Sequence, residues 1–189
     1  YGGVTLWTKD YSNKWKSSDL IWKGSHNKVI FSPDGKYLVT SMQENRLHFW
    51  RLKDKYAAGM SGYVTKVKSF AFAHDSKYLA TSGAEYTVCW PFDGDGPEGR
   101  EPICFPYLGK KLVKLVEPFP NENAIFTGFS DGSVFLSQIE NLDNTIIIRS
   151  STSSEVSAIA VTSDRSNLLI GDMGGNILWT SIWGDEENN

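Results

Sequence analysis

The alternation of apolar and polar positions is clearest in residues 29–50, VIFSPDGKYLVTSMQENRLHFW. Residues 29–31 form an apolar segment that runs into the turn SPDG at residues 32–35, where glycine takes positive φ without a Cβ clash. A segment rich in β-branched and aromatic residues returns at 36–40, and another follows at 47–50 after a polar break. The pattern predicts three short strands in a row.

The same order of strands recurs along the chain. Residues 4–7 match the third strand of the unit, so the chain starts within a copy. The remaining expected elements are a polar loop at 10–18, a short strand at 20–22, later three-strand copies over 67–90, 113–136 and 156–182, and outer strands at 56–59, 103–106 and 145–149. The chain therefore reads as repeats of one β-unit.

The spacing of the third strands identifies the kind of repeat. These strands end at Trp7, Trp50, Trp90, Ser137 and Thr180, with intervals of 43, 40, 47 and 43 residues. A period near 40–45 residues with four strands per unit is typical of a β-propeller blade. Turn signals of the SPDG kind and β-branched strands exclude a helical solenoid of similar period.

We therefore predict an all-β fold, a portion of a β-propeller over residues 1–183. Its expected parts are a blade remnant at 1–23 and blades at 24–60, 61–106, 107–149 and 150–183. The acidic tail, residues 184–189, is expected to be disordered because it has too little apolar surface to bury.

Composition narrows the class of protein. Hydrophobic residues make up 40% of the chain and charged residues 22%, as in ordinary globular domains. The net charge of −3 argues against nucleic-acid or anionic-membrane partners, which require a basic surface. Cys89 and Cys104 lack metal-ligand spacing, and we expect two reduced thiols on neighbouring strands of one sheet.

Several common motifs of enzyme chemistry are missing from the sequence. It contains no Walker loop, H-E-x-x-H or C-x-x-C motif. The three histidines, His26, His48 and His74, occupy different positions of their units, and no nucleophile accompanies them. The acidic loop DGDGPEG lacks the bidentate glutamate of a calcium loop. We expect no catalysis, no metal and no cofactor.

The first full unit resembles a WD repeat. It has Gly24-Ser25-His26 where that family has Gly-His, the SPDG turn, and Trp50-Arg51 where the family has Trp-Asp. The resemblance implies a buried hydrogen-bonded tetrad of His, Ser/Thr, Asp and Trp within each blade. The positions that match are His26, Thr40 and Trp50, with Glu44 at the Asp position, Thr81 and Trp90 in the second copy, and Thr127 and Asp131 in the third. The second copy has Ala84 at the Asp position and the third has Ser137 for Trp, so the tetrads are degraded.

The segments WKGSH, SMQENRLHFWRL and CWPFDGDGP also resemble a group of uncharacterised bacterial WD-repeat proteins. This resemblance implies a cytoplasmic bacterial protein. It further implies that these roughly four blades are the C-terminal part of a seven-bladed ring, whose last blade is completed by a strand from sequence before Tyr1.

The resemblance implies a non-catalytic scaffold that docks other proteins on one loop face. The residues expected on that face are Glu44, Tyr63, Lys66, Glu85, Tyr86, Phe129 and Met173. Aromatic anchors ringed by charge are typical of interface hot spots, although Tyr63 and Phe129 are equally well explained as covers for the ends of their blades.

An alternative is a periplasmic or ligand-binding propeller of the envelope-associated TolB type, whose units also carry SPDGK turns. Those units do not typically end the third strand in Trp, whereas VTLW and LHFW do. The sequence therefore favours the WD type.

Overall fold

A computed structural model describes residues 1–106, 109 and 111–182. All regular structure in these ranges is β, in seventeen strands, and they contain no helix with the length and apolarity needed to cross a bilayer. The chain divides into two compact units, Tyr1–Val67 and Lys68–Asn189, which are described separately. The expected disorder of residues 184–189 lies outside the described residues.

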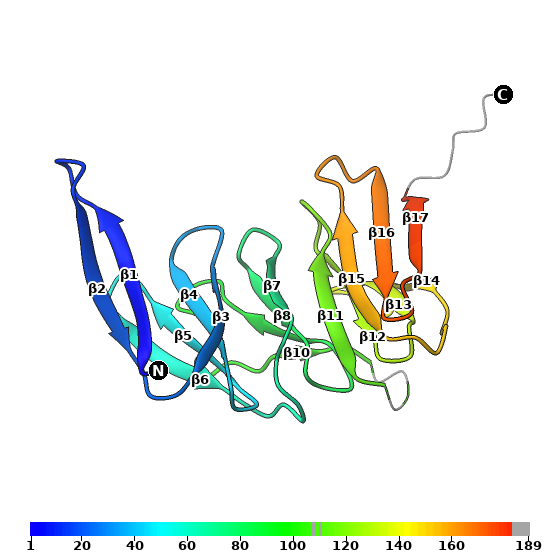
Figure 1. Cartoon of the computed structure of the whole chain (residues 1–189), viewed down its shortest axis with the longest axis horizontal. Coiled ribbons are helices and arrows are strands. Elements are labelled where there is room, and N and C mark those ends of the chain that lie inside the picture. Colours follow the sequence, from blue (N-terminus) through cyan, green and yellow to red (C-terminus); the bar gives the residue numbers. More distant parts are fainter. Residues whose placement is uncertain (107–108, 110, 183–189) are drawn as a thin grey trace. The chain divides into compact units, whose positions relative to one another are not determined.

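The first unit contains two antiparallel sheets (Figure 1). The smaller is the ribbon β1(Gly3–Lys9) and β2(Trp15–Ile21). The larger has the order β3-β4-β5-β6, with the bounds β3(His26–Phe31), β4(Tyr37–Met42), β5(Leu47–Arg51) and β6(Tyr56–Met60). The strand order read from residues 29–50 is confirmed.

The prediction of a polar loop over residues 10–18 is wrong at its second half, because β2 already begins at Trp15. The connection is a tight turn in which the Asp10 carboxylate accepts hydrogen bonds from the backbone N–H groups of Ser12 and Lys14, at 2.9 and 3.1 Å. Leu20 is the one fully buried residue of β2. A strand that buries so little carries no apolar alternation, which is why its sequence reads as a loop.

The second unit contains three antiparallel sheets that follow one another along the chain (Figure 1). Their orders are β10-β9-β8-β7, β11-β12-β13-β14 and β15-β16-β17. The bounds are β7(Phe70–Ala73), β8(Tyr78–Thr81), β9(Val88–Pro91), β10(Ile103–Cys104), β11(Val113–Pro118), β12(Ala124–Phe129), β13(Val134–Gln138), β14(Thr145–Arg149), β15(Val156–Val161), β16(Asn167–Asp172) and β17(Ile177–Ser181). Four-stranded units of the predicted order are therefore present.

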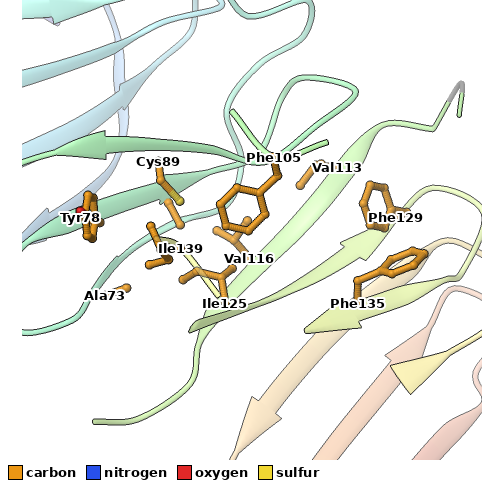
Figure 2. Packing of buried hydrophobic residues seen from close by; sticks show 11 residues of the cluster. Ala73, Tyr78, Cys89, Phe105, Val113, Val116, Ile125, Phe129, Phe135 and Ile139 are labelled. Carbon is orange, nitrogen blue, oxygen red and sulfur yellow. The ribbon is translucent and has the colours of Figure 1, made fainter. Parts of the chain in front are cut away.

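The apolar core of the second unit lies between successive sheets. Strand β12 is buried along its whole length because both of its faces are covered. Ile125 belongs to a cluster shared with the β7–β10 sheet, including Tyr78 and Phe105, which Figure 2 shows. Its neighbour Phe126 points to the other face and packs with Ile159 of β15. Alternate residues of one strand thus join two neighbouring sheets.

The two cysteines lie on neighbouring strands, as expected. Cys104 of β10 is in register with Val88, and Ile103 is in register with Cys89 of β9. Both thiols are free. Burial raises the pKa of Cys89, so this thiol stays protonated and unreactive.

Two hairpin turns place glycine at the same register position. Gly132 connects β12 to β13 with φ +87°, and Gly175 connects β16 to β17 with φ +82°. A Cβ on Gly132 would lie 2.1 Å from Oγ1 of Thr152 and 2.5 Å from the backbone oxygen of Ser154, whereas a Cβ on Gly175 would meet nothing within 4 Å. Both turns require positive φ, but at Gly132 the neighbouring segment also excludes any side chain.

We expect Gly132→Ala to lower the free energy of unfolding by about 2 kcal/mol more than Gly175→Ala does, because the former adds overpacking to the shared conformational strain. Urea denaturation of the two variants measures the difference. Equal losses would show that the segment at Thr152 and Ser154 moves away without resistance.

Candidate functional site

The sheet β3–β6 holds a hydrogen-bonded group that begins at His26, the first residue of β3. Nδ1 of His26 lies 2.8 Å from Oγ1 of Thr40 on β4, and Nε2 lies 3.3 Å from the carbonyl oxygen of Trp22. Because a carbonyl oxygen only accepts, Nε2 carries a proton and donates to Trp22, while the Thr40 hydroxyl lies close both to Nδ1 and, at 3.4 Å, to the carbonyl oxygen of His48. The structure thus joins His26 and Thr40 directly.

Trp50 and Glu44, the other two matched positions of this copy, differ in their surroundings. Trp50 is 1% exposed, and its ring centroid lies 5.5 Å from that of His26. Glu44 is exposed, and its carboxylate lies beside Gly24. The place next to Nε2 of His26 is taken by the Trp22 backbone, so His26 is held by a carbonyl oxygen where the WD pattern has an aspartate.

His48 is fully buried between two tryptophans. Its ring stacks on Trp22 with centroids 4.0 Å apart and meets Trp50 edge-on at 4.3 Å. Neither ring nitrogen has a hydrogen-bond partner among the residues that the structure describes. Burial, with smaller contributions from the positive charges of His26 and Arg46, lowers the pKa of His48 to about 4. The imidazole is therefore a neutral aromatic spacer at neutral pH.

The second and third copies arrange their threonines differently. Oγ1 of Thr81 donates to the carbonyl oxygen of Val88 within its own sheet, at 3.0 Å. Oγ1 of Thr127 lies 2.7 Å from Oγ1 of Thr87, the residue just before β9 of the preceding sheet. The register position of His26 is Val113 in β11, so Thr127 has no imidazole to bond. A hydroxyl pair between sheets replaces the bond within a sheet.

Hydrogen bonds tie the loops at one end of the second unit into a continuous edge. We call the loops 82–87, 111–112, 130–133, 150–155 and 173–176 the loop rim. Val113 N–H donates to the Ala84 oxygen at 2.9 Å, and Ser130 N–H donates to the Leu112 oxygen at 2.9 Å. Thr152 N–H donates to the Asp131 oxygen at 3.0 Å. The hairpin loops 82–87 and 130–133 are thereby fixed to the segment that enters the next sheet, and the loop 173–176 is fixed to the segment that enters its own sheet, because Met173 N–H donates to the Glu155 oxygen at 2.8 Å.

Asp131, predicted as a tetrad member, is an organiser of this rim. Its Oδ1 accepts from the backbone N–H and the hydroxyl of Ser133, at 3.0 and 2.6 Å, and its Oδ2 lies 2.8 Å from Nζ of Lys111. Burial opposes ionisation, but the bonds from Lys111 and Ser133 outweigh it and lower the pKa of Asp131 to about 2. The carboxylate shapes the turn and is charged at neutral pH.

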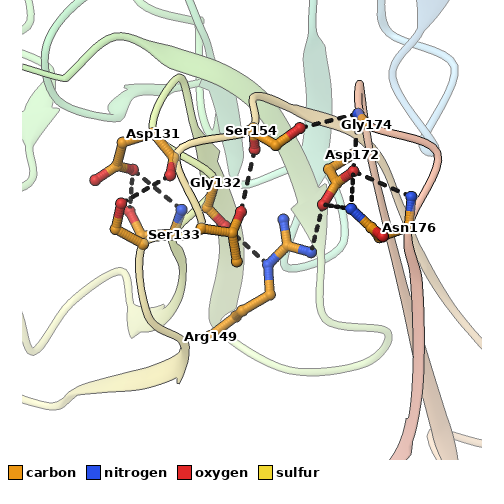
Figure 3. Close-up of polar contacts among 10 residues, drawn as sticks. Asp131, Gly132, Ser133, Arg149, Ser154, Asp172, Gly174 and Asn176 are labelled. Carbon is orange, nitrogen blue, oxygen red and sulfur yellow. Dashed lines mark hydrogen bonds and ion pairs between the residues drawn. The ribbon is translucent and has the colours of Figure 1, made fainter.

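Arg149 and Asp172 connect the third sheet of the second unit to the second, as Figure 3 shows. Nε of Arg149 donates to the Gly132 oxygen at 2.8 Å, and Nη1 lies 3.5 Å from Oδ2 of Asp172. The Asp172 side chain is 1% exposed, and its Oδ1 accepts from the N–H groups of Gly174 and Asn176. Burial raises the pKa of Asp172, but these bonds and the charge of Arg149 hold it below its usual range.

The residues expected on a docking face differ in exposure. Met173 is 72% exposed and Tyr86 36%, and Glu44, Lys66 and Glu85 are also at the surface. Tyr63 is 8% exposed and Phe129 only 4%, so these rings cover apolar interior. Phe129 packs edge-on against Phe135 at 5.4 Å. Four of the seven residues, Glu85, Tyr86, Phe129 and Met173, belong to the second unit, where Phe129 lies just before the rim and the other three lie on it.

Sequence reasoning missed Trp22, His48 and the Arg149–Asp172 pair. His48 lies two residues before Trp50 on a strand, and this spacing places both rings on one face. This spacing could therefore have identified the pair of rings from the sequence. Arg149 and Asp172 are 23 positions apart on different sheets, and no local pattern connects them.

Comparisons with known proteins bear on the repeat and on the fold. Residues 22–51 match the family model "WD domain, G-beta repeat". We call this segment, which is similar to one WD repeat, the WD40 repeat. No curated protein matches the chain by sequence.

Two of the solved structures that resemble this chain illustrate its fold. The β-propeller domain of Myceliophteria thermophila Cps50 (Swd1) has a TM-score of 0.64 at 16% identity, over 86% of this chain and 53% of that one. The computationally designed Ika4 protein has a TM-score of 0.65 at 13% identity, over 86% of this chain and 94% of that one. The chain spans about half the length of the Cps50 domain. The predicted all-β propeller portion is confirmed, and the WD-repeat propeller family is supported; the seven-bladed ring stays a prediction.

In the WD40 repeat, His26→Ala leaves the Thr40 hydroxyl and the Trp22 carbonyl without their shared partner. We expect the free energy of unfolding to fall by about 1–3 kcal/mol, as for other broken buried hydrogen bonds. The control Asn27→Ala, at an exposed neighbour, is expected to change it by less than about 0.5 kcal/mol. Chemical denaturation of both variants measures these changes, and equal stabilities would contradict a stabilising role for His26.

His48 predicts a pH dependence. Its pKa is about 4 in the folded chain against 6.5 in the unfolded chain, so only the unfolded state takes up a proton between these values. Stability is therefore complete above pH 6.5 and falls by about 3 kcal/mol as the pH drops to 4. His48→Leu should flatten the dependence of stability on pH. Leu47→Ala should lower stability at every pH and leave this pH dependence unchanged. If His48→Leu kept the pH dependence of the parent chain, this dependence could not be assigned to His48.

Proposed function

We propose that this chain is a non-catalytic scaffold that docks partner proteins on the loop rim of its Lys68–Asn189 unit. The observation that carries the proposal is the continuous hydrogen-bonded arrangement of the rim, which holds exposed Met173 and Tyr86 on fixed loops. A preorganised surface loses less conformational freedom on binding than a mobile one does. The WD40 repeat at residues 22–51 and the propeller fold are consistent with a protein-interaction scaffold.

The chemistry of the rim suits a protein partner. Methionine adapts its shape to a partner, and aromatic residues and methionine are enriched in interface cores. Charged pairs lie on the rim or next to it: Lys111 with Asp131 and Lys114 with Glu155, the latter at 2.8 Å. The net charge of −3 supports proteins over nucleic acid or anionic membranes as partners. A cytoplasmic location in a bacterium is proposed on the resemblance alone.

The polar side chains of the rim support a structural rather than catalytic role. The carboxylates of Asp131 and Asp172 are occupied by backbone and side-chain donors, and the pKa of each is lowered. A general base requires a pKa closer to neutrality. The alternative of a ligand-binding propeller is favoured by one observation, a cavity between two sheets of the second unit, which the next subsection describes.

We expect the double variant Met173→Glu/Tyr86→Ala to lose partners that the parent chain captures, because a buried charge and a lost ring both weaken an apolar contact. Affinity capture followed by mass spectrometry compares the two proteins. The matched control is Ile147→Glu, which adds the same charge at a residue of β14 that is 62% exposed. Thermal melts establish that all variants are folded.

Partners that the double variant loses and Ile147→Glu keeps would support the loop rim as the docking surface. Equal recovery of partners by the parent and the double variant would overturn the choice of surface. Loss in both variants would point to a general effect of added charge and would also count against the rim.

A further inference from the structure

The fourth sheet along the chain, β11–β14, lacks a large side chain that two other sheets have at one register position. Trp50 is paired with Leu38 in β4–β5, and Trp90 is paired with Leu79 in β8–β9. The same position in β12–β13 pairs Ser137 with Ile125. In the first unit the indole of Trp50 is buried against Leu20 of the preceding sheet. At Ser137 that indole is missing.

A cavity of about 150 Å³ lies at this place, between the sheets β7–β10 and β11–β14. It is partly open to solvent. The rings of Phe105, Phe129 and Phe135, which Figure 2 shows, form much of its apolar wall. The neighbouring sheets have not closed over the position where the side chain is short, because the rings around it are fixed by their own packing: Phe129 and Phe135 meet edge-on at 88°.

Besides Pro106 and Leu142, the rest of the lining consists of hydroxyl-bearing residues, which form two pairs. Oγ1 of Thr87 and Oγ1 of Thr127 are 2.7 Å apart, and Oγ1 of Thr145 donates to Oγ of Ser137 at 3.0 Å. A hydroxyl has one donor and two acceptor positions, so a pair with a single mutual bond keeps acceptor capacity for a further polar atom. The cavity therefore combines aromatic walls with hydrogen-bond acceptors.

We propose that this cavity is a binding site for a small planar aromatic molecule with one N–H donor, of the indole class. An apolar cavity of roughly 150 Å³ is large enough to bind a benzene ring. The aromatic walls suit the ring faces and edges, and the hydroxyl pairs accept from the ring N–H. Most of its recognition chemistry uses Thr127, Ser137 and Thr145 within the sheets, and Thr87 is the lining residue that the cavity shares with the loop rim.

The test uses the full chain and free indole, with toluene as an apolar probe of similar shape. Titration followed by 15N–1H correlation spectra should show saturable shifts around Thr127, Ser137 and Phe135, and indole should bind several-fold more tightly than toluene. Ser137→Trp fills the cavity, and we expect it to weaken indole binding by at least about tenfold. Thr180→Trp is the matched control, because Thr180 holds the same register position opposite Leu168 in β16–β17.

Two further variants keep the test decisive if Ser137→Trp does not fold. Ser137→Leu fills part of the cavity and should also weaken indole binding. Thr145→Val keeps the shape and removes a hydroxyl, so it should reduce the preference for indole over toluene. Absence of saturable shifts up to the solubility of indole, binding that survives the Ser137 variants, or equal affinity for indole and toluene would each overturn the proposal.

Discussion

Apolar contact between successive sheets is the constraint on which the rest of the Lys68–Asn189 unit depends. Strand β12 shows it most clearly, because Ile125 packs against the preceding sheet and Phe126 against the following one. A sheet covered on both faces leaves little room for unpaired polar groups along its strands. Most charged side chains of the unit therefore lie at strand ends and in loops. The loop rim is rich in polar side chains because the apolar core between the sheets excludes them.

The few polar groups inside the sheets are satisfied in different ways. In the WD40 repeat, His26 bonds Thr40 within one sheet and the Trp22 backbone next to it. In β12 the threonine finds its partner in the loop that leads into β9 of the neighbouring sheet instead. His48 is the exception, since its ring is buried between two indole rings and neither ring nitrogen has a hydrogen-bond partner within the described part of the chain. Common strand order thus coexists with polar contacts that differ from sheet to sheet.

The sequence predicted the strand order well because turns such as SPDG interrupt short alternating segments at regular intervals. It failed at β2, where a strand exposed along most of its length has the composition of a loop. It also could not decide that the rings of Tyr63 and Phe129 are buried. Whether a ring at a strand end meets solvent depends on the adjacent sheet, and Phe129 is covered by Phe135. The cavity beside Ser137 depends on the same kind of non-local packing.

The hydroxyl pair between Thr87 and Thr127 has a consequence for how this sequence can vary. Replacing one of the two threonines by valine leaves the other hydroxyl buried without its partner, whereas replacing both removes two polar groups together and is far less damaging. Two residues 40 positions apart are therefore energetically coupled. We expect homologous chains that lose one threonine to have lost the other as well.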